Sequence, residues 1–228
     1  KKQATLKTAF YDIIKSPSVT NYDGLWTSFK TTDKKSDGKV WDMYSDVPNG
    51  KPAYVYSFGT NQCGSYSGEG SCYNREHSFP KSWFNDASPM ISDVFHLYPT
   101  DGYVNGRRSN YPFGEVGIAT WTSTNGSKLG KNTSDGYTGT VFEPIDEYKG
   151  DFARTYFYMA TCYEDKIAGW YSNSEAQAAL NGTKYPAYKD WYIKLMLKWS
   201  REDPVSQKEI DRNNAAYAVQ KNRNPYID

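Results

Sequence analysis

Histidine and cysteine are scarce in this chain of 228 residues, which contains two histidines and three cysteines. No Cys-x-x-Cys pair is present, so the clustered ligands of a structural zinc site are missing and such a site is not expected. Cys63 and Cys72 border a loop rich in glycine and serine, where they form either a disulfide or two free thiols. Cys162 stands in an apolar run and is expected to be a buried, unpaired residue.

An excess of charge of one sign is also missing, since 27 Lys and Arg residues face 26 Asp and Glu residues. This balance excludes a uniformly basic protein that coats nucleic acid, so any action on nucleic acid must depend on local charge or on a metal. No apolar run approaches the roughly 20 residues of a membrane span, and no membrane partner is expected. The lysines at the start are not followed by the apolar stretch of a signal peptide, which is therefore absent or already removed.

Hydrophobic spacing predicts helices at both ends of the chain. Leu6, Phe10, Ile13 and Ile14 recur at helical spacing, which indicates a helix over 3–15 that ends before Pro17. Further helices are predicted over 151–163 and 188–199. A last helix is predicted from the N-cap and proline at 203–204 to about residue 222.

The middle of the chain is predicted to be richer in strands. Aromatic and β-branched runs at 40–44, 53–58, 77–79 and 94–98 predict short strands, and 121–140 reads as an extended loop or an edge hairpin. The segment 100–110 opens with Thr100 and Asp101, which is typical of a helix start. We therefore expect a single α+β domain over 1–228, with a small antiparallel sheet flanked by helices.

Chemically, the most informative segment is Asn74-Arg-Glu-His-Ser-Phe-Pro80. Glu76 offers the oxygen ligands that suit Mg²⁺ or Ca²⁺, and His77 is the side chain best matched to general-base catalysis near neutral pH. Adjacent residues leave opposite faces of a strand, yet at a strand end both can line one cavity. Asn105 adds a neutral oxygen ligand, which leaves positive charge on a metal for a phosphodiester. Arg107 and Arg108 offer guanidinium groups to phosphate oxygens.

These motifs, in this order, resemble those of the bacterial endonuclease I family of secreted or periplasmic nucleases, whose catalytic core has the ββα-metal fold shared with HNH nucleases. The resemblance also includes Phe95-His-Leu-Tyr-Pro-Thr-Asp101, Val104-Asn-Gly-Arg-Arg-Ser-Asn110, the pattern at 22–29 and the closing segment 220–226. It covers most of the chain and places the core at about 73–110.

The resemblance implies a role for each matching residue. His77 is implied as the general base, and Glu76 and Asn105 as ligands of one Mg²⁺, with Mn²⁺ or Ca²⁺ as substitutes. The substrates implied are DNA and RNA, cleaved by a monomeric, secreted or periplasmic enzyme to products with 5′-phosphates. Some family members hold the product phosphate with an arginine in an insertion that is missing here. The candidates for that task are Arg75, Arg107, Arg108, Arg212 and Arg223.

Two other interpretations are compatible with the composition. Seven tryptophans and 21 tyrosines suit a secreted carbohydrate-binding module without catalysis, which leaves Glu76, His77 and Asn105 unexplained. A glycosidase with paired carboxylates is the second alternative, and it needs no metal. His96 follows an apolar residue and is expected to be structural, paired with Asp93.

Overall fold

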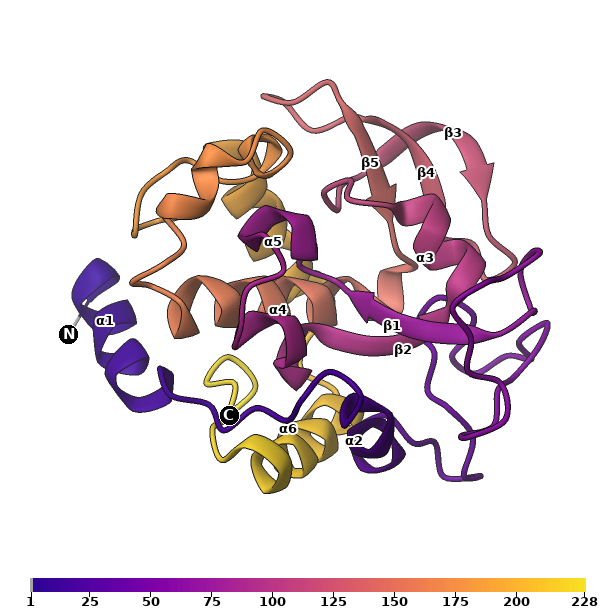
Figure 1. Cartoon of the computed structure of the whole chain (residues 1–228). Helices are drawn as coiled ribbons and strands as arrows, with labels where there is room; N and C mark the ends of the chain where they lie inside the picture. Colours follow the sequence, from indigo (N-terminus) through magenta and orange to yellow (C-terminus); the bar gives the residue numbers. More distant parts are fainter. Residues whose placement is uncertain (1) are drawn as a thin grey trace.

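The computed structural model describes residues 2–228 (Figure 1). Its six α-helices in that range are α1 (Gln3–Ile14), α2 (Leu25–Thr32), α3 (Gly102–Arg108), α4 (Lys149–Cys162), α5 (Asp190–Glu202) and α6 (Gln207–Gln220). One sheet contains β1 (Tyr73–His77) and β2 (Leu97–Asp101), and the other contains β3 (Val116–Thr122), β4 (Lys128–Asn132) and β5 (Thr140–Glu143). The predicted α+β class is confirmed.

A two-stranded antiparallel sheet followed by one helix occupies the middle of the chain. β1 pairs with β2 so that His77 lies opposite Leu97 and Tyr73 lies opposite Asp101. Asp101 ends β2 and also caps α3, because its side chain accepts a hydrogen bond from the Val104 N–H. The β1–β2–α3 unit therefore has the ββα order expected of the 73–110 core.

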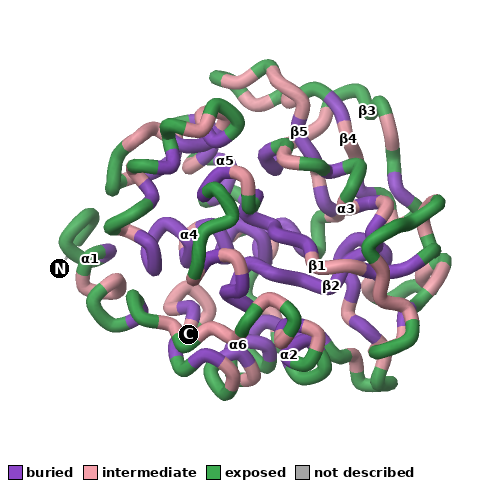
Figure 2. Tube along the Cα trace, in the orientation of Figure 1, coloured by how far each residue is buried: buried purple, intermediate pink, exposed green. Residues whose placement is uncertain are grey.

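The main core surrounds α4, which runs through the centre of the molecule (Figure 2). Almost every residue of α4 is buried, and so is every residue of β2. Aromatic rings fill much of this space: Phe113 and Tyr156, for example, pack with ring centroids 5.7 Å apart. The buried rings thus form a rigid support beneath the ββα unit.

The last helix, α6, holds the segment that leads into β2. Arg212 of α6 donates hydrogen bonds of 2.8 Å to the backbone carbonyls of Val94 and Leu97. At the end of the same helix, the Gln220 side chain accepts from the Val94 N–H and donates to Asp93. Segments far apart in sequence therefore fix one end of the small sheet.

The three-stranded sheet lies on the side of α3 (Figure 1), and its strand β5 contributes the buried Val141 and Phe142 to the main core. β4 is its central strand, and β3 is an edge strand whose residues are mostly exposed. Of the extended loop or edge hairpin that the sequence allowed for 121–140, the structure has a hairpin of β3 and β4, which begins earlier, at Val116, and is extended by β5.

Two predicted strands, 40–44 and 53–58, are wrong. The first is a turn around Asp42, whose side chain accepts hydrogen bonds from the Tyr44 N–H and the Ser45 hydroxyl. A short acidic side chain that bonds its own backbone competes with strand pairing. Val40 and Tyr56 are buried and are linked by one backbone hydrogen bond. The apolar residues of these two segments therefore serve packing in the core without forming a strand.

Other boundaries differ by a few residues. The strand predicted at 94–98 begins at Leu97, because Asp93 caps a short 3₁₀ turn over Val94–His96. The final helix begins after Ser206, which forms a capping box with Glu209, and Asp203 instead follows the end of α5. The helix over 3–14 is confirmed, but its apolar face is only partly buried.

The cysteines behave in two ways. Cys63 and Cys72 form a disulfide, which decides between the two states that the sequence allowed. Cys162 is a buried free thiol, as expected. Among residues 2–228, no helix has both the length and the apolar character to cross a membrane.

Candidate active site

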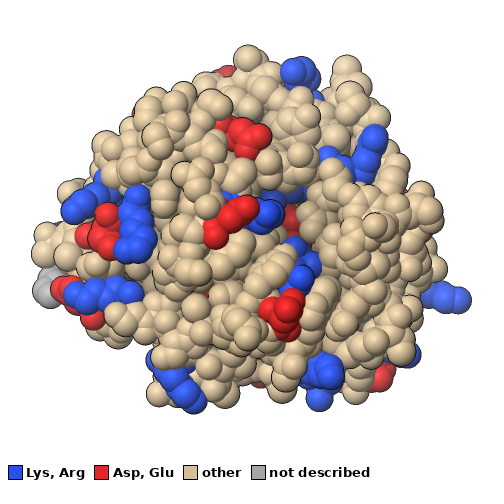
Figure 3. Space-filling view, in the orientation of Figure 1, with Lys and Arg blue, Asp and Glu red and all other residues tan. Residues whose placement is uncertain are grey.

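The side chains of β1 project from its two opposite faces. Asn74 and Glu76 project toward α3, whereas Arg75 and His77 project toward the segment that leads into α2, because side chains alternate along a strand. Figure 3 shows charged side chains gathered along a furrow on this face of the molecule. Glu76 and His77, adjacent in the chain, therefore leave opposite faces at the end of β1.

Glu76 is almost fully buried, with 2% of its surface exposed. Its Oε1 accepts hydrogen bonds from the Tyr44 hydroxyl at 2.7 Å and from Arg108 Nη1 at 2.9 Å. Burial raises the pKa of the Glu76 carboxyl, while Arg108 and the Tyr44 hydroxyl oppose that shift. Oε2 accepts no hydrogen bond from residues 2–228 and remains available as a ligand atom.

His77 has a defined tautomer in this structure. Its Nε2 lies 3.0 Å from the carbonyl oxygen of Ile91. A carbonyl can only accept, so Nε2 carries the proton and Nδ1 keeps its lone pair. Nδ1 has no hydrogen-bond partner within residues 2–228. The imidazole is therefore oriented so that it can accept a proton at Nδ1.

The surroundings of His77 keep it neutral. Burial lowers the pKa of His77 well below its ordinary value, and the neighbouring His96 lowers it further. The Tyr22 ring stacks on the imidazole with centroids 5.8 Å apart, and the guanidinium of Arg75 lies 3.6 Å from the centroid of the Tyr22 ring. This stack restricts rotation of the imidazole and adds a nearby cation that disfavours protonation.

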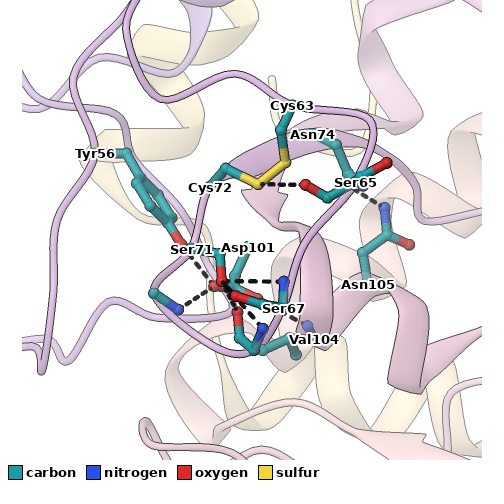
Figure 4. Close-up of a disulfide and its surroundings, with 12 residues drawn as sticks. Tyr56, Cys63, Ser65, Ser67, Ser71, Cys72, Asn74, Asp101, Val104 and Asn105 are labelled. Carbon is teal, nitrogen blue, oxygen red and sulfur yellow. Dashed lines mark hydrogen bonds between the residues drawn. A yellow bond between two sulfur atoms is a disulfide. The ribbon is translucent and has the colours of Figure 1, made fainter.

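Asn105 is held by a second asparagine. Its Nδ2 donates to Oδ1 of Asn74 at 2.7 Å, as Figure 4 shows. Asn105 and Arg108 lie one turn apart on α3, and they bind Asn74 and Glu76, which lie two residues apart on the same face of β1. The helix is thus fixed to the strand at two points, and the Asn105 Oδ1 is left without a partner within residues 2–228.

The loop closed by the disulfide supports the start of α3 (Figure 4). The Asp101 side chain accepts from the Gly70 N–H of that loop at 2.8 Å and from the Tyr56 hydroxyl at 2.6 Å. The Gly102 N–H donates to the Cys72 carbonyl at 2.9 Å. These bonds connect the disulfide to the helix that carries Asn105.

Arg108 differs from the expectation of a phosphate contact. Its guanidinium is 1% exposed and bonds Glu76 as well as the backbone carbonyls of His77 and Ser78. The ring of Phe113 covers it at 4.7 Å. A group enclosed in this way cannot meet a phosphate at the surface in this conformation, so its contacts make Arg108 a support for Glu76.

Arg107 is the contrasting residue. Its side chain is exposed and forms no ion pair or hydrogen bond with residues 2–228. The other arginine candidates for a phosphate contact are already paired: Arg75 with Asp23, Arg212 with Asp33 and Arg223 with Asp228. Arg107 is the arginine among these that keeps its hydrogen-bond donors free.

His96 is a buried neighbour of His77, with ring centroids 5.5 Å apart. Its Nε2 donates to the Met90 carbonyl at 2.6 Å, which fits the expected structural role. The expected pairing with Asp93 is not formed. Asp93 instead accepts from the hydroxyls of Tyr158 and Tyr163.

The oxygen atoms available near β1 fit a hard divalent cation. Within residues 2–228, no three His, Cys, Asp or Glu side chains gather at one point that could hold a metal ion. The expected site needs only one carboxylate and one amide, because Mg²⁺ commonly retains water ligands and takes others from phosphate. Glu76 Oε2 and Asn105 Oδ1 have the appropriate chemistry.

Sequence reasoning missed three residues of this site. Tyr22 and Asn74 belong to segments that carried the family resemblance, so a signal for them was present. Tyr44 lies in the turn that was mistaken for a strand, and no sequence signal indicated its hydrogen bond to Glu76.

Comparisons with known proteins identify the family of the chain. The family model described as Endonuclease I matches residues 2–228. The chain belongs to the endonuclease I family. It is therefore a nuclease, as the order of the motifs predicted, and the carbohydrate-binding alternative is set aside.

Two extracellular ribonucleases from Bacillus are similar along the whole chain. The protein from Bacillus amyloliquefaciens is 32% identical over 100% of this chain and 72% of its own length. The protein from Bacillus subtilis (strain 168) is 30% identical over 98% of this chain and 71% of its own length. A periplasmic deoxyribonuclease from Aeromonas hydrophila is 29% identical over 61% of this chain and 48% of its own length. These extracellular and periplasmic relatives confirm the predicted secreted or periplasmic location.

Proposed function

We propose that this nuclease is a metal-dependent endonuclease that hydrolyses phosphodiester bonds of both DNA and RNA with little sequence preference. The relatives named ribonuclease and deoxyribonuclease support both substrates. The groups around β1 suit recognition of a phosphate, which carries no sequence information. The enzyme acts as a monomer outside the cytoplasm.

His77 is the general base of the reaction. Its Nδ1 takes a proton from a water molecule, and the resulting hydroxide attacks the phosphorus atom. The bond from phosphorus to the 3′ oxygen breaks, and that oxygen takes a proton from solvent. The products then carry a 5′-phosphate and a 3′-hydroxyl.

Glu76 and Asn105 hold one Mg²⁺, for which Mn²⁺ or Ca²⁺ can substitute. When bound, the ion supplies positive charge that stabilises the charge developing on the phosphate oxygens. Arg108 neutralises part of the Glu76 charge and fixes the carboxylate in place. With one amide and one partly neutralised carboxylate, the site leaves net positive charge for the substrate.

Arg107 contacts a phosphate of the substrate. Its guanidinium is exposed, lacks a carboxylate partner within residues 2–228, and belongs to the same helix as Asn105. A guanidinium fork matches the geometry of phosphate oxygens. This residue takes over the phosphate contact that was also considered for Arg108.

The tautomer of His77 carries this proposal. The hydrogen bond from Nε2 to Ile91 leaves Nδ1 as a base, directly after the buried carboxylate of Glu76. The structural His96 makes the same kind of bond from Nε2 but is fully enclosed, whereas His77 keeps 6% of its surface exposed and directly follows the candidate metal ligand Glu76.

The decisive experiment is cleavage of a plasmid and of a long RNA by wild type and by His77→Ala, with Mg²⁺ and with EDTA. We expect cleavage that EDTA abolishes and that falls by about a hundredfold or more in the variant, as loss of a general base predicts. Thermal melting of both proteins controls for folding. Cleavage that persists in EDTA, or a fully active variant, refutes the mechanism.

A further inference from the structure

Three aromatic side chains gather beside the proposed metal ligands. Tyr103 of α3 lies 6.2 Å from Trp121 of β3, and Tyr66 of the disulfide loop meets Tyr103 edge-on at 6.1 Å between centroids. Tyr66 is exposed, and Tyr103 and Trp121 are half-buried. We call these three residues the aromatic platform. Unlike the rings around α4, they retain surface in contact with solvent.

A cation lies on this platform. The guanidinium of Arg107 is 5.3 Å from the centroid of Trp121 and 6.0 Å from that of Tyr103. Planar guanidinium groups stack on aromatic faces and still direct their N–H donors outward. The platform therefore combines surfaces for flat rings with a donor for phosphate.

The platform is also close to the reacting groups. Tyr103 and Arg107 share one face of α3, and Asn105 lies on the other. Tyr66 reaches toward the Asn105 side, because a Cβ added at Gly106 would collide with the Tyr66 hydroxyl. A Cβ added at Gly102 would lie 2.8 Å from the Tyr66 ring and 3.3 Å from Nδ2 of Asn74. Asn74 in turn accepts the hydrogen bond of Asn105. A strand whose phosphate lies at Glu76 and Asn105 therefore has Tyr66, the near edge of the platform, within reach of a neighbouring nucleotide.

We propose that the aromatic platform stacks a base next to the scissile phosphate and that the enzyme consequently prefers unpaired nucleic acid over duplex. Aromatic side chains stack on any base, which gives affinity without sequence preference. In a duplex, each base is already stacked and paired, so its ring cannot reach a side chain without disrupting the helix. The platform selects for an unpaired base and not for the sugar, so single-stranded DNA and RNA both satisfy it.

This inference rests on the proposed function, because it assigns a substrate class to the same site. Its test is therefore binding in EDTA, which does not require cleavage. A labelled single-stranded oligonucleotide of mixed sequence and a blunt duplex of equal length are titrated with protein. Fluorescence anisotropy reports both affinities.

We expect Trp121→Leu to weaken binding of the single strand by about tenfold and to change duplex binding by less than about twofold. The matched control is Tyr137→Leu, which removes a ring stacked on Trp191 in another part of the molecule, at a centroid distance of 4.8 Å. It should leave both affinities unchanged. Equal losses for both nucleic acids, or no loss, overturn the inference.

A second comparison changes the nucleic acid by removing bases. Abasic sites in the single strand should weaken its binding to wild type about as much as Trp121→Leu does, and they should have no effect on binding to that variant. Arg107→Gln should instead weaken single strand and duplex alike and reduce the salt dependence by about one phosphate contact. If abasic and normal strands bind equally well to wild type, no base is stacked and the inference fails.

Cleavage assays in Mg²⁺ distinguish failure of the platform inference from failure of the nuclease mechanism. If wild type cleaves but the binding contrast is missing, the platform inference fails and the nuclease mechanism stands. If the binding contrast is present without metal-dependent cleavage, the mechanism fails and the platform is a binding site for unpaired strands.

Discussion

Single residues at this site serve purposes that the sequence could only partly indicate. The pair Arg107 and Arg108 looked equivalent as a short basic run. One guanidinium is exposed on aromatic rings, whereas the other is enclosed with Glu76 beneath Phe113. Their helical positions differ by about 100°, which is enough to place one in solvent and the other in the core. The phase of a short helix relative to its sheet cannot be determined from a run of two arginines.

Arg108→Met tests the role of the buried ion pair. We expect it to lower the free energy of unfolding by about 3–5 kcal/mol, because it leaves the Glu76 carboxylate buried without its cation. Urea denaturation of variant and wild type measures this. Arg107→Met, the exposed neighbour, should change stability by less than about 0.5 kcal/mol. Unchanged stability in Arg108→Met together with weaker substrate binding would instead identify a phosphate contact.

The pH dependence tests the state of His77. The base must be neutral, so activity falls as pH decreases through the pKa of His77. Burial and the neighbouring His96 depress that pKa. We therefore expect the acid limb of kcat/KM to lie clearly below pH 6.5, the ordinary value. The profile is measured at saturating Mg²⁺, so that loss of metal does not imitate protonation. An inflection of kcat/KM at or above pH 6.5 would contradict a His77 whose pKa is depressed by burial.

At the level of elements, strong periodicity and capping determined what could be predicted. α4 and α5 were predicted within a few residues because their apolar spacing is helical over several turns. The order β1–β2–α3 followed from the family resemblance and from the cap at Asp101. The segments 40–44 and 53–58 misled because aromatic residues favour strands but also fill irregular cores, and only tertiary contacts distinguish the two.

The start of α3 provides a test at this scale. Asp101→Ala removes the cap that bonds Val104, Gly70 and Tyr56. We expect a loss of about 1–3 kcal/mol in unfolding free energy and weaker Mg²⁺ binding, because α3 positions Asn105. The control Ser206→Ala removes the cap of α6 and should cost about 1 kcal/mol without weakening Mg²⁺ binding. Calorimetric titration measures the Mg²⁺ affinity of both variants. Equal affinities would mean that the Asp101 cap does not position the metal ligand Asn105.

At the level of the whole molecule, the near-zero net charge conceals where the charges lie. Three arginines are enclosed, and each has a carboxylate partner: Arg108 with Glu76, Arg154 with Glu209 and Arg212 with Asp33. These pairs contribute nothing to the surface that a polynucleotide meets. Composition alone therefore could not show where a nucleic acid binds, whereas the order of the motifs could show that one is cleaved.

The residues predicted for the site came together only in part. Asn105 and Glu76 both take part in the contacts between α3 and β1, as the motif order implied. His77 is the last residue of β1. Their supports, Tyr44 and the Ile91 carbonyl, come from segments without regular strand structure. Such contacts depend on how distant loops pack, and a linear pattern does not record that.

The position of α6 has a consequence for the order of folding. Arg212 and Gln220 hold the segment that enters β2, and both leave the ribosome after residues 73–108. A nascent chain can therefore already contain the ββα unit while it still lacks the helix that fixes it. The ordering of the strand entrance thus waits for α6 to be synthesised.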